Sequence, residues 1–395
     1  GEVSVLGIVL NLAVLPTVSV VLICGVCCVA VGFMSISAAG ICLIPGKILL
    51  MLYEKLCVLA GAVPFCTWIG GAPEIWQCVV YYVLLFGGIQ IALFLKEKGA
   101  YRVWRVLSRG ICVAVVCVSI FILGFRQKNL ISITCLDIGQ GDGIVIQLPG
   151  GKTVMVDGGS SSKKKVASYQ ILPYLKNQGI SVVDAMLISH TDLDHISGVQ
   201  ELLTLKEKHL TTLRIKNLLL PDWKAPEEVC YELEEQAKRC GISVLRLQQG
   251  QKLWCGDGSL EILSPETGAK GTDVNEEGIV MELQYGKFRG LFTGDIGAET
   301  EKKLLPKLDD VNFLKVGHHG SRYSTCQEFL DKIKPELAVI SCSESNTYGH
   351  PSPETTARLE ENEIRTEYTM KNGAITVVTD GHSMRMKTFC NEKTA

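Results

Sequence analysis

Residues 189–195 bring metal-binding side chains together within one short segment. Two histidines and two aspartates fall within six residues, namely His190, Asp192, Asp194 and His195. Charges this dense repel one another unless a cation compensates them, so the segment is hard to explain as solvated surface. The apolar run at residues 185–188 predicts a strand directly before it. We therefore expect these side chains to form a metal site in one loop at the end of that strand.

Further candidate ligands follow other predicted strands. Asp295 comes after the run 289–292 and Gly294, and His318 and His319 come after the run 313–316. His350 lies in a Gly-His-Pro turn, where we expect a role in the site, although such a turn also suits a surface histidine. His209 and His382 have no such context and are predicted to lie on the surface.

Alternating strands and helices must position these residues. Strands are predicted by period-2 patterns over residues 131–137, 143–148, 153–156, 185–188, 217–220, 243–247, 278–285, 289–292, 313–316, 337–341 and 374–379. Helices are predicted over residues 165–178, 199–208 and 227–240. Two β-rich halves around a helical middle favour a sandwich of sheets with helices outside.

The first 124 residues have a different composition. They hold seven of the 39 Lys and Arg residues and four of the 41 Asp and Glu residues, so that 32 basic and 37 acidic residues remain beyond them. Residues 3–46 carry no charge and are long enough to cross a bilayer of ~30 Å twice, with breaks expected at Pro16 or within residues 32–40. This run either packs against other helices and lines a cavity or is a simple kinked anchor. Residues 47–65 are predicted to lie on the membrane surface, and 75–95 and 103–125 to span it.

The connection between the last two spans indicates the orientation of the chain. It carries five basic residues against a single acid, Glu97. By the positive-inside rule this connection is cytoplasmic, so one more crossing places the part after residue 124 on the outer face of the cell membrane. The hydrophobic start on Gly1 leads us to expect a fragment of a longer multi-pass membrane protein.

Several motifs together resemble those of known hydrolases. His190-x-Asp192-x-Asp194-His195, the upstream Asp157-Gly158-Gly159, Gly294-Asp295 and His318-His319-Gly320 resemble the metallo-β-lactamase motifs. More narrowly, the segments 136–142, 189–198, 314–321 and 348–351 resemble the ComEC competence proteins, in which a membrane competence domain is joined to such a hydrolase domain. The similarity covers nearly the whole chain.

The resemblance implies an α-helical transmembrane segment, residues 1–124, followed by an α/β metallo-β-lactamase-like αββα sandwich, residues 125–395. It implies two metal ions, one held by His190 and Asp192 and the other by Asp194 and His195, with Asp295 bridging. His319 aligns with the last ligand because Gly320 follows it, which leaves His318 to contact the substrate. Asp157 would be a structural residue that orients the ligand loop.

Two departures from the family pattern bear on the metal. Asp192 stands where the commoner pattern has His, and the separate His expected before Asp295 is missing. The first metal is then held more weakly or more openly, or only one metal binds. The carboxylate-rich ligand set shifts the preference from Zn²⁺ toward Mn²⁺.

Two divalent cations about 4 Å apart suit displacement at a phosphodiester. The catalytic residues are predicted to be Asp194, His318 and His350. Ser321 and Arg322 are candidate phosphate-binding residues, although Arg322 also suits a solvated surface charge.

The function predicted is DNA uptake, with one strand cleaved as the other enters. The partners predicted are DNA (single- or double-stranded), membrane lipid and other competence proteins. The alternatives are hydrolysis of a phosphocholine or acyl ester, or DNA binding by an inactive domain.

Overall fold

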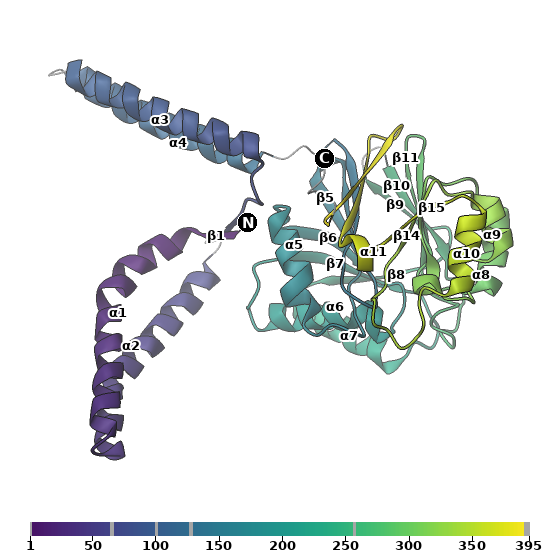
Figure 1. Ribbon diagram of the computed structural model, residues 1–395, viewed down its shortest axis with the longest axis horizontal. Helices are drawn as coiled ribbons and strands as arrows, with labels where there is room; N and C mark the ends of the chain where they lie inside the picture. Colours follow the sequence, from purple (N-terminus) through teal and green to yellow (C-terminus); the bar gives the residue numbers. More distant parts are fainter. Residues whose placement is uncertain (1, 64–66, 99–101, 126–128, 256–257, 391–395) are drawn as a thin grey trace. The chain divides into compact units, whose positions relative to one another are not determined.

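The structure is a computed structural model that describes residues 2–63, 67–98, 102–125, 129–255 and 258–390 (Figure 1). The chain divides into two units by its internal contacts. One consists of Gly1–Gly124 with Lys176–Gly179, and the other of Phe125–Leu175 with Ile180–Ala395. Each unit is described by itself.

Four long apolar helices make up most of the first unit. They are α1 (Val5–Gly32), α2 (Ile36–Ala62), α3 (Ile75–Lys98) and α4 (Arg102–Gly124). Helix α1 packs beside α2, and α3 packs beside α4 (Figure 1). All four are long and apolar enough to cross a membrane, which confirms the predicted helical membrane segment. The short strands β1 (Glu2–Ser4) and β2 (Thr67–Ile69) pair antiparallel.

The first two helices correct details of the sequence interpretation. Pro16 lies inside α1 without ending it, and the break falls after Gly32, where Ser35 caps α2 by accepting a hydrogen bond from the Ala38 amide. Residues 47–62 continue α2 instead of forming a separate surface helix, because scattered charged side chains do not interrupt helical backbone hydrogen bonds. Residues 64–65 of that predicted segment and 99–101 of the basic connection lie outside the described residues.

Two mixed sheets form the centre of the second unit. The eight-stranded sheet has the order β17 (Met384–Thr388), β16 (Ile375–Thr379), β3 (Ile131–Cys135), β4 (Gly143–Leu148), β5 (Lys152–Asp157), β6 (Val182–Leu187), β7 (Arg214–Pro221) and β8 (Ser243–Leu247). The seven-stranded sheet has the order β15 (Arg365–Tyr368), β14 (Leu337–Ile340), β13 (Phe313–Lys315), β12 (Phe288–Phe292), β11 (Val280–Tyr285), β10 (Gly258–Ser264) and β9 (Lys252–Cys255). Strands β5 to β8 and β12 to β15 run parallel, and the other pairs are antiparallel.

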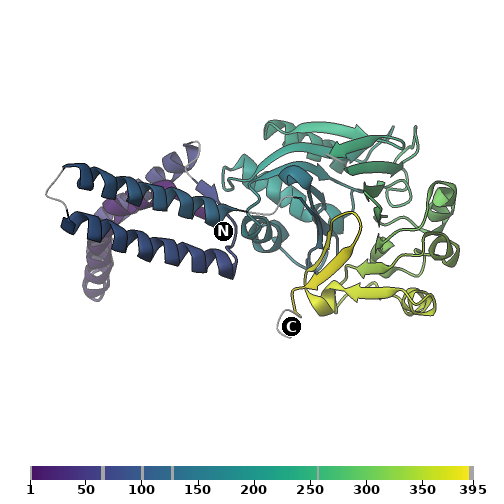
Figure 2. The same cartoon turned by 90° about the horizontal axis from the view of Figure 1, so that it is seen from above.

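The sheets face each other and carry helices on their outer faces (Figure 2). One buried cluster joins Ile133 and Ile144 of the larger sheet to Met281 and Leu283 of the smaller one. Helices α5 (Leu172–Asn177), α6 (Leu193–Glu207) and α7 (Glu228–Arg239) accompany the larger sheet, and α8 (Ala298–Leu304), α9 (Gln327–Ile333) and α10 (Pro353–Glu361) the smaller one. Short helical segments complete the unit: η1 (Pro149–Gly151), η2 (Ala167–Ile171), η3 (Leu305–Lys307), η4 (Gly317–Gly320) and α11 (Thr369–Asn372). This is the predicted αββα sandwich, which the structure confirms.

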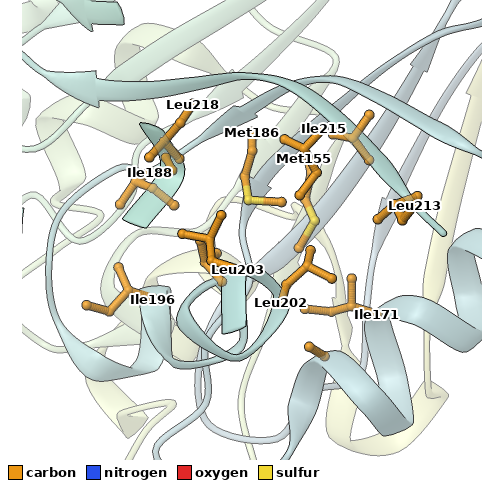
Figure 3. Close-up of a cluster of buried hydrophobic side chains, with 14 of the residues drawn as sticks. Met155, Ile171, Met186, Ile188, Ile196, Leu202, Leu203, Leu213, Ile215 and Leu218 are labelled. Carbon is orange, nitrogen blue, oxygen red and sulfur yellow. The ribbon is translucent and has the colours of Figure 1, made fainter. Parts of the chain in front are cut away.

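The core under α6 fixes the element that carries two of the six predicted metal ligands, Asp194 and His195. Leu202 and Leu203 of α6 pack against Met155 of β5 and Met186 of β6, and none of these side chains is solvent-exposed (Figure 3). Large-to-small substitutions in such cores cost about 2–5 kcal/mol each. The first turn of α6 is therefore held on a rigid base.

Candidate metal centre

The ligand segment after β6 is part loop and part helix. His190 lies in the loop, Asp192 is the N-cap residue of α6, and Asp194 and His195 lie in the first turn of the helix. The sequence interpretation placed all four in a loop and started the helix at residue 199, which is wrong. Helical geometry fixes Asp194 and His195 more firmly than a loop would.

The other candidate ligands follow β12 and β13 of the opposite sheet. Asp295 comes three residues after Phe292, and His318 and His319 lie in η4 after Lys315. Both histidines have left-handed backbone torsions, with φ of 47° and 53°. Non-glycine residues rarely adopt such torsions, and they persist where surrounding contacts hold them, often at functional sites.

Asp157 ties the end of β5 to the ligand segment. Its Oδ1 accepts a hydrogen bond from the Ser189 amide at 2.7 Å, and its Oδ2 accepts one from Ser189 Oγ at 2.7 Å. The same Oδ2 lies 2.9 Å from His195 Nδ1. A proton on Nδ1 satisfies this contact and leaves Nε2 with a free lone pair, as a metal-binding histidine requires. These contacts are those that the predicted orienting role of Asp157 needs.

Two glycines allow the neighbouring turns to interlock with α6. A Cβ on Gly159 would lie 2.5 Å from the backbone nitrogen of His195. Gly141 has φ of +146°, and a Cβ there would lie 2.1 Å from the Gly159 carbonyl oxygen. Any side chain at either position would push the ligand helix away.

Four buried ligand atoms converge at the centre of the site. One atom each from Asp142, His195, Asp295 and His319 lies within 4.8 Å of the others. Every one of these residues is at most 4% exposed. Asp142 Oδ1, Asp295 Oδ1 and the Nε2 atoms of His195 and His319 have no hydrogen-bond partner among the residues that the structure describes. Because unpaired buried polar atoms are costly, this donor set fits a bound cation.

Asp295 is the central carboxylate. Its Oδ2 lies 3.3 Å from His195 Nε2, 3.6 Å from His319 Nε2 and 3.9 Å from His318 Nε2. Burial acts to raise the pKa of Asp295, but His195 and His319 hold it well below its usual value. Asp295 Oδ2 thus lies near imidazole nitrogens of three histidines, and the bridging role expected of Asp295 stays a prediction.

The remaining predicted ligands lie next to this centre, and the His190 ring centroid is 4.0 Å from that of His195. His190 is fully buried, and within the described part of the chain its Nε2 has no hydrogen-bond partner; that atom lies 3.6 Å from Asp192 Oδ2. Asp194 Oδ2 lies 3.4 Å from His319 Nε2. The structure therefore brings all six predicted metal ligands into one region.

His318 and His350 lie at the more exposed side of the site. The His318 side chain is 33% exposed, whereas that of His319 is 1% exposed. The His350 ring centroid lies 5.5 Å from that of His318 and 6.5 Å from that of His319. Burial, followed by the charges of His318 and His319, lowers the pKa of His350 to about 4, so its ring is neutral at pH 7.

The two predicted phosphate-binding residues are engaged elsewhere. Ser321 is buried, and its hydroxyl accepts a hydrogen bond from the Tyr323 amide at 3.3 Å. Arg322 lies at the surface and forms an ion pair of 3.6 Å with Glu354. Neither the Ser321 hydroxyl nor the Arg322 guanidinium makes a direct contact with a described candidate ligand of the buried cluster.

Asp142 and Lys315 are two residues of the site that the sequence motifs did not predict. Asp142 lies in the segment that carried the family resemblance, directly after the Gly139-Gln140-Gly141 turn. Lys315 Nζ lies 2.8 Å from Asp142 Oδ2, with both side chains buried. A lysine inside the apolar run 313–316 was the available signal, because a fully buried lysine is almost always paired.

The family model of the metallo-beta-lactamase superfamily matches residues 136–344. The chain belongs to this superfamily. It is also homologous to competence proteins. ComE operon protein 3 of Bacillus subtilis is 29% identical over 69% of this chain and 36% of its own length, and Competence protein ComA of Neisseria gonorrhoeae is 27% identical over 63% and 32%. The chain thus spans about a third of the length of these relatives.

Among solved structures, the metallo-beta-lactamase fold protein YhfI of Bacillus subtilis covers 60% of this chain and 96% of its own, at 12% identity and a TM-score of 0.42. The superfamily match covers Asp142, Asp157, the segment His190–His195, Asp295 and the histidine pair. The buried Asp/His cluster is typical of the metal sites of metallo-β-lactamase domains and indicates a metal-dependent hydrolase domain.

Proposed function

We propose that the metallo-β-lactamase domain is a metal-dependent phosphodiesterase that cleaves DNA and degrades one strand during uptake of the other. The observation that carries the proposal is the convergence of unpartnered ligand atoms from Asp142, His195, Asp295 and His319 in a buried site. The homology to competence proteins supports DNA as the substrate.

Two divalent cations are the proposed cofactors. Their ligands are His190, Asp192, Asp194, His195, Asp295 and His319, with Asp295 shared. When bound, the cations supply an activated water molecule and neutralise charge on the phosphodiester. Asp142 adds a fourth buried or half-buried carboxylate to this set, which strengthens the preference for Mn²⁺ over Zn²⁺ because oxygen-rich sites suit harder ions.

The protein's own residues divide the remaining work. Asp157 holds His195 with Nε2 toward the centre, and Ser341 O, 3.0 Å from His319 Nδ1, does the same for His319. His318 is exposed enough to reach a phosphate oxygen or a leaving group, and proton transfer from such a position contributes about 10²–10⁴-fold to rate. His350, beside it, contacts the substrate.

The excess of acidic residues beyond residue 124 gives DNA no general electrostatic attraction. Binding then depends on the cations and on local contacts, with other competence proteins as partners that deliver DNA.

We further propose that residues 125–395 fold as an independent domain. We place this domain on the outer face of the membrane, as the basic connection between α3 and α4 predicts. Reporter fusions after Thr134 test the orientation, and a cytoplasmic signal would reverse it.

The decisive experiment is metal analysis of the purified chain together with cleavage assays on DNA, phosphocholine esters and acyl esters across several divalent ions. We expect bound metal and Mn²⁺-supported DNA cleavage that chelation abolishes. Metal-dependent cleavage of another ester but not of DNA would replace the proposed substrate. Binding of DNA without any hydrolysis would leave a transport component with an inactive domain.

A further inference from the structure

A row of aromatic rings leads from solvent to the buried cluster. Tyr348 is 60% exposed, and its ring stacks on that of His350 with centroids 5.8 Å apart and planes 23° apart. The His350 ring lies 5.5 Å from the ring of His318, whose Nε2 faces Asp295. Tyr348 is therefore the outermost ring of a contact path that ends at the central carboxylate.

The segment that carries these rings is held by its own hydrogen bonds. Asn346 Oδ1 accepts from the His350 amide at 3.0 Å, and Asn346 Nδ2 donates to the His350 carbonyl at 2.6 Å and to the Ser343 carbonyl at 2.8 Å. The stacked pair of Tyr348 and His350 thus lies in a loop closed by one asparagine.

The same segment is fastened to the loop that follows β13. The Ser352 amide donates to the Gly320 carbonyl at 2.8 Å, and Thr355 Oγ1 donates to the Ser321 carbonyl at 2.7 Å. Because η4 and this loop carry His318 and His319, the position of Tyr348 is coupled to that of the cluster. A ligand group lying on Tyr348 is held beside the site.

An exposed tyrosine backed by a second ring is a platform for a flat apolar group. Stacking of a nucleobase on an aromatic side chain contributes about 1–3 kcal/mol per base and tolerates any base. A base inside a duplex is already stacked on both neighbours, so it offers no free face unless it leaves the helix. A platform of this kind next to a phosphodiesterase site selects unpaired nucleotides.

We propose that Tyr348, backed by His350, stacks on an unpaired base next to the scissile phosphate, and that the site therefore takes single-stranded DNA in preference to duplex. The inference rests on the proposed nuclease function for its cleavage assay only. In the competing interpretation, Tyr348 merely stabilises its own loop, and its loss affects every substrate alike.

The first test compares an intact single strand with strands that lack one base at successive positions around the cleavage site, using the full chain in detergent micelles with Mn²⁺. Tyr348→Ala is expected to raise KM for the intact strand about tenfold with little change in kcat, a change that corresponds to ~1.4 kcal/mol of stacking. Wild type and Tyr348→Ala should become equal on the strand that lacks the contacted base. Tyr348→Phe should retain wild-type KM, because it keeps the ring.

Tyr169→Ala is the matched control, since Tyr169 is another exposed tyrosine of the same unit, in η2. It should leave KM unchanged on every strand. Equal losses for Tyr348→Ala on intact and base-lacking strands, or faster cleavage of duplex than of single strand by wild type, would overturn the inference.

The second test needs no cleavage. A single strand with 2-aminopurine at the contacted position, mixed with the chain in Ca²⁺ or in chelator, should lose fluorescence on binding through stacking. Tyr348→Ala should abolish this quenching and Tyr348→Phe should keep it. Tyr348-dependent quenching without cleavage in any ion would support the stacking site while refuting the nuclease function. Cleavage without Tyr348-dependent quenching would refute the stacking site alone.

Discussion

Lys315 and Asp142 form an ion pair that solvent does not reach. The ammonium nitrogen lies 2.8 Å from Asp142 Oδ2, and the two side chains are 1% and 2% exposed. The same nitrogen donates to the Val316 carbonyl at 3.1 Å. Burial acts to raise the pKa of Asp142, but Lys315, followed by His319 and His195, holds it below its usual value. The pair therefore keeps a charged carboxylate in place in the buried cluster of candidate ligands.

Replacing one partner of this pair should be costly. Lys315→Met leaves the Asp142 charge buried without its partner, and such changes cost about 3–5 kcal/mol. We expect a lower unfolding temperature for Lys315→Met, measured on the chain in detergent micelles with chelator present. The double variant Lys315→Met/Asp142→Leu should recover most of the loss, because no uncompensated charge remains. A Lys315→Met variant as stable as wild type would show that the pair does not hold Asp142.

A second buried carboxylate should make stability depend on pH in a predictable direction. Glu282 in β11 is 4% exposed, and its Oε1 lies 3.6 Å from Arg289 and has no hydrogen-bond partner in the described ranges of the chain. Burial raises the pKa of Glu282, with Arg289 opposing the shift. The folded state therefore binds the proton of the Glu282 carboxyl more tightly than the unfolded state does. The stability that protonated Glu282 contributes is present below pH 4.5 and is lost as pH rises through the pKa of Glu282 in the folded state.

Glu282→Gln removes this titration while keeping the shape and an acceptor for Gln284. We expect it to raise the unfolding temperature at pH 8, by about 2–4 °C for each kcal/mol recovered, and to lose that advantage near pH 4. Glu299→Gln, an exposed carboxylate paired with Lys303, is the control and should show no such pH-dependent gain. A gain of equal size at both pH values would contradict the assignment.

The pattern of the chain predicted the sandwich because most strands are buried on at least one face. Runs such as 143–148 and 337–340 are apolar and bounded by turn residues, so their type and position are local properties. Strand β15 was missed because its side chains are polar and only half-buried, and its place at the edge of the sheet comes from pairing with β14. The start of α6 was missed because its first turn carries the polar side chains of Asp194 and His195 and shows no apolar periodicity.

The site was predicted in part because some of its residues form a local pattern in the sequence. Their close spacing was enough to identify four of them, namely His190, Asp192, Asp194 and His195. Asp142 and Lys315 are 173 positions apart, and only the facing of the two sheets brings them together. No local pattern specifies such a pair.

Loss of the Asp295 carboxylate should affect metal content more than loss of the Asp192 carboxylate. Asp295 Oδ2 is close to three histidines, whereas Asp192 has a contact of 3.6 Å with His190 and is 47% exposed. Asp295→Ala should therefore lose both metal ions or the bridge between them, whereas Asp192→Ala should lose at most one metal ion. Metal content by mass spectrometry on the two purified variants decides the matter. Equal stoichiometry in both would remove the bridging assignment.

The adjacent histidines should separate metal binding from substrate chemistry. The contact of His319 Nδ1 with Ser341 O directs its buried Nε2 to Asp194 and Asp295, whereas His318 is a third exposed and faces His350. His319→Ala should lose both metal and activity. His318→Ala should keep metal and lose about 10²–10⁴-fold in kcat, as expected for loss of a proton-transfer group. His382→Ala, at an exposed turn after β16, should leave metal content and DNA cleavage unchanged. If His318→Ala strips the metal and His319→Ala does not, the two roles are exchanged.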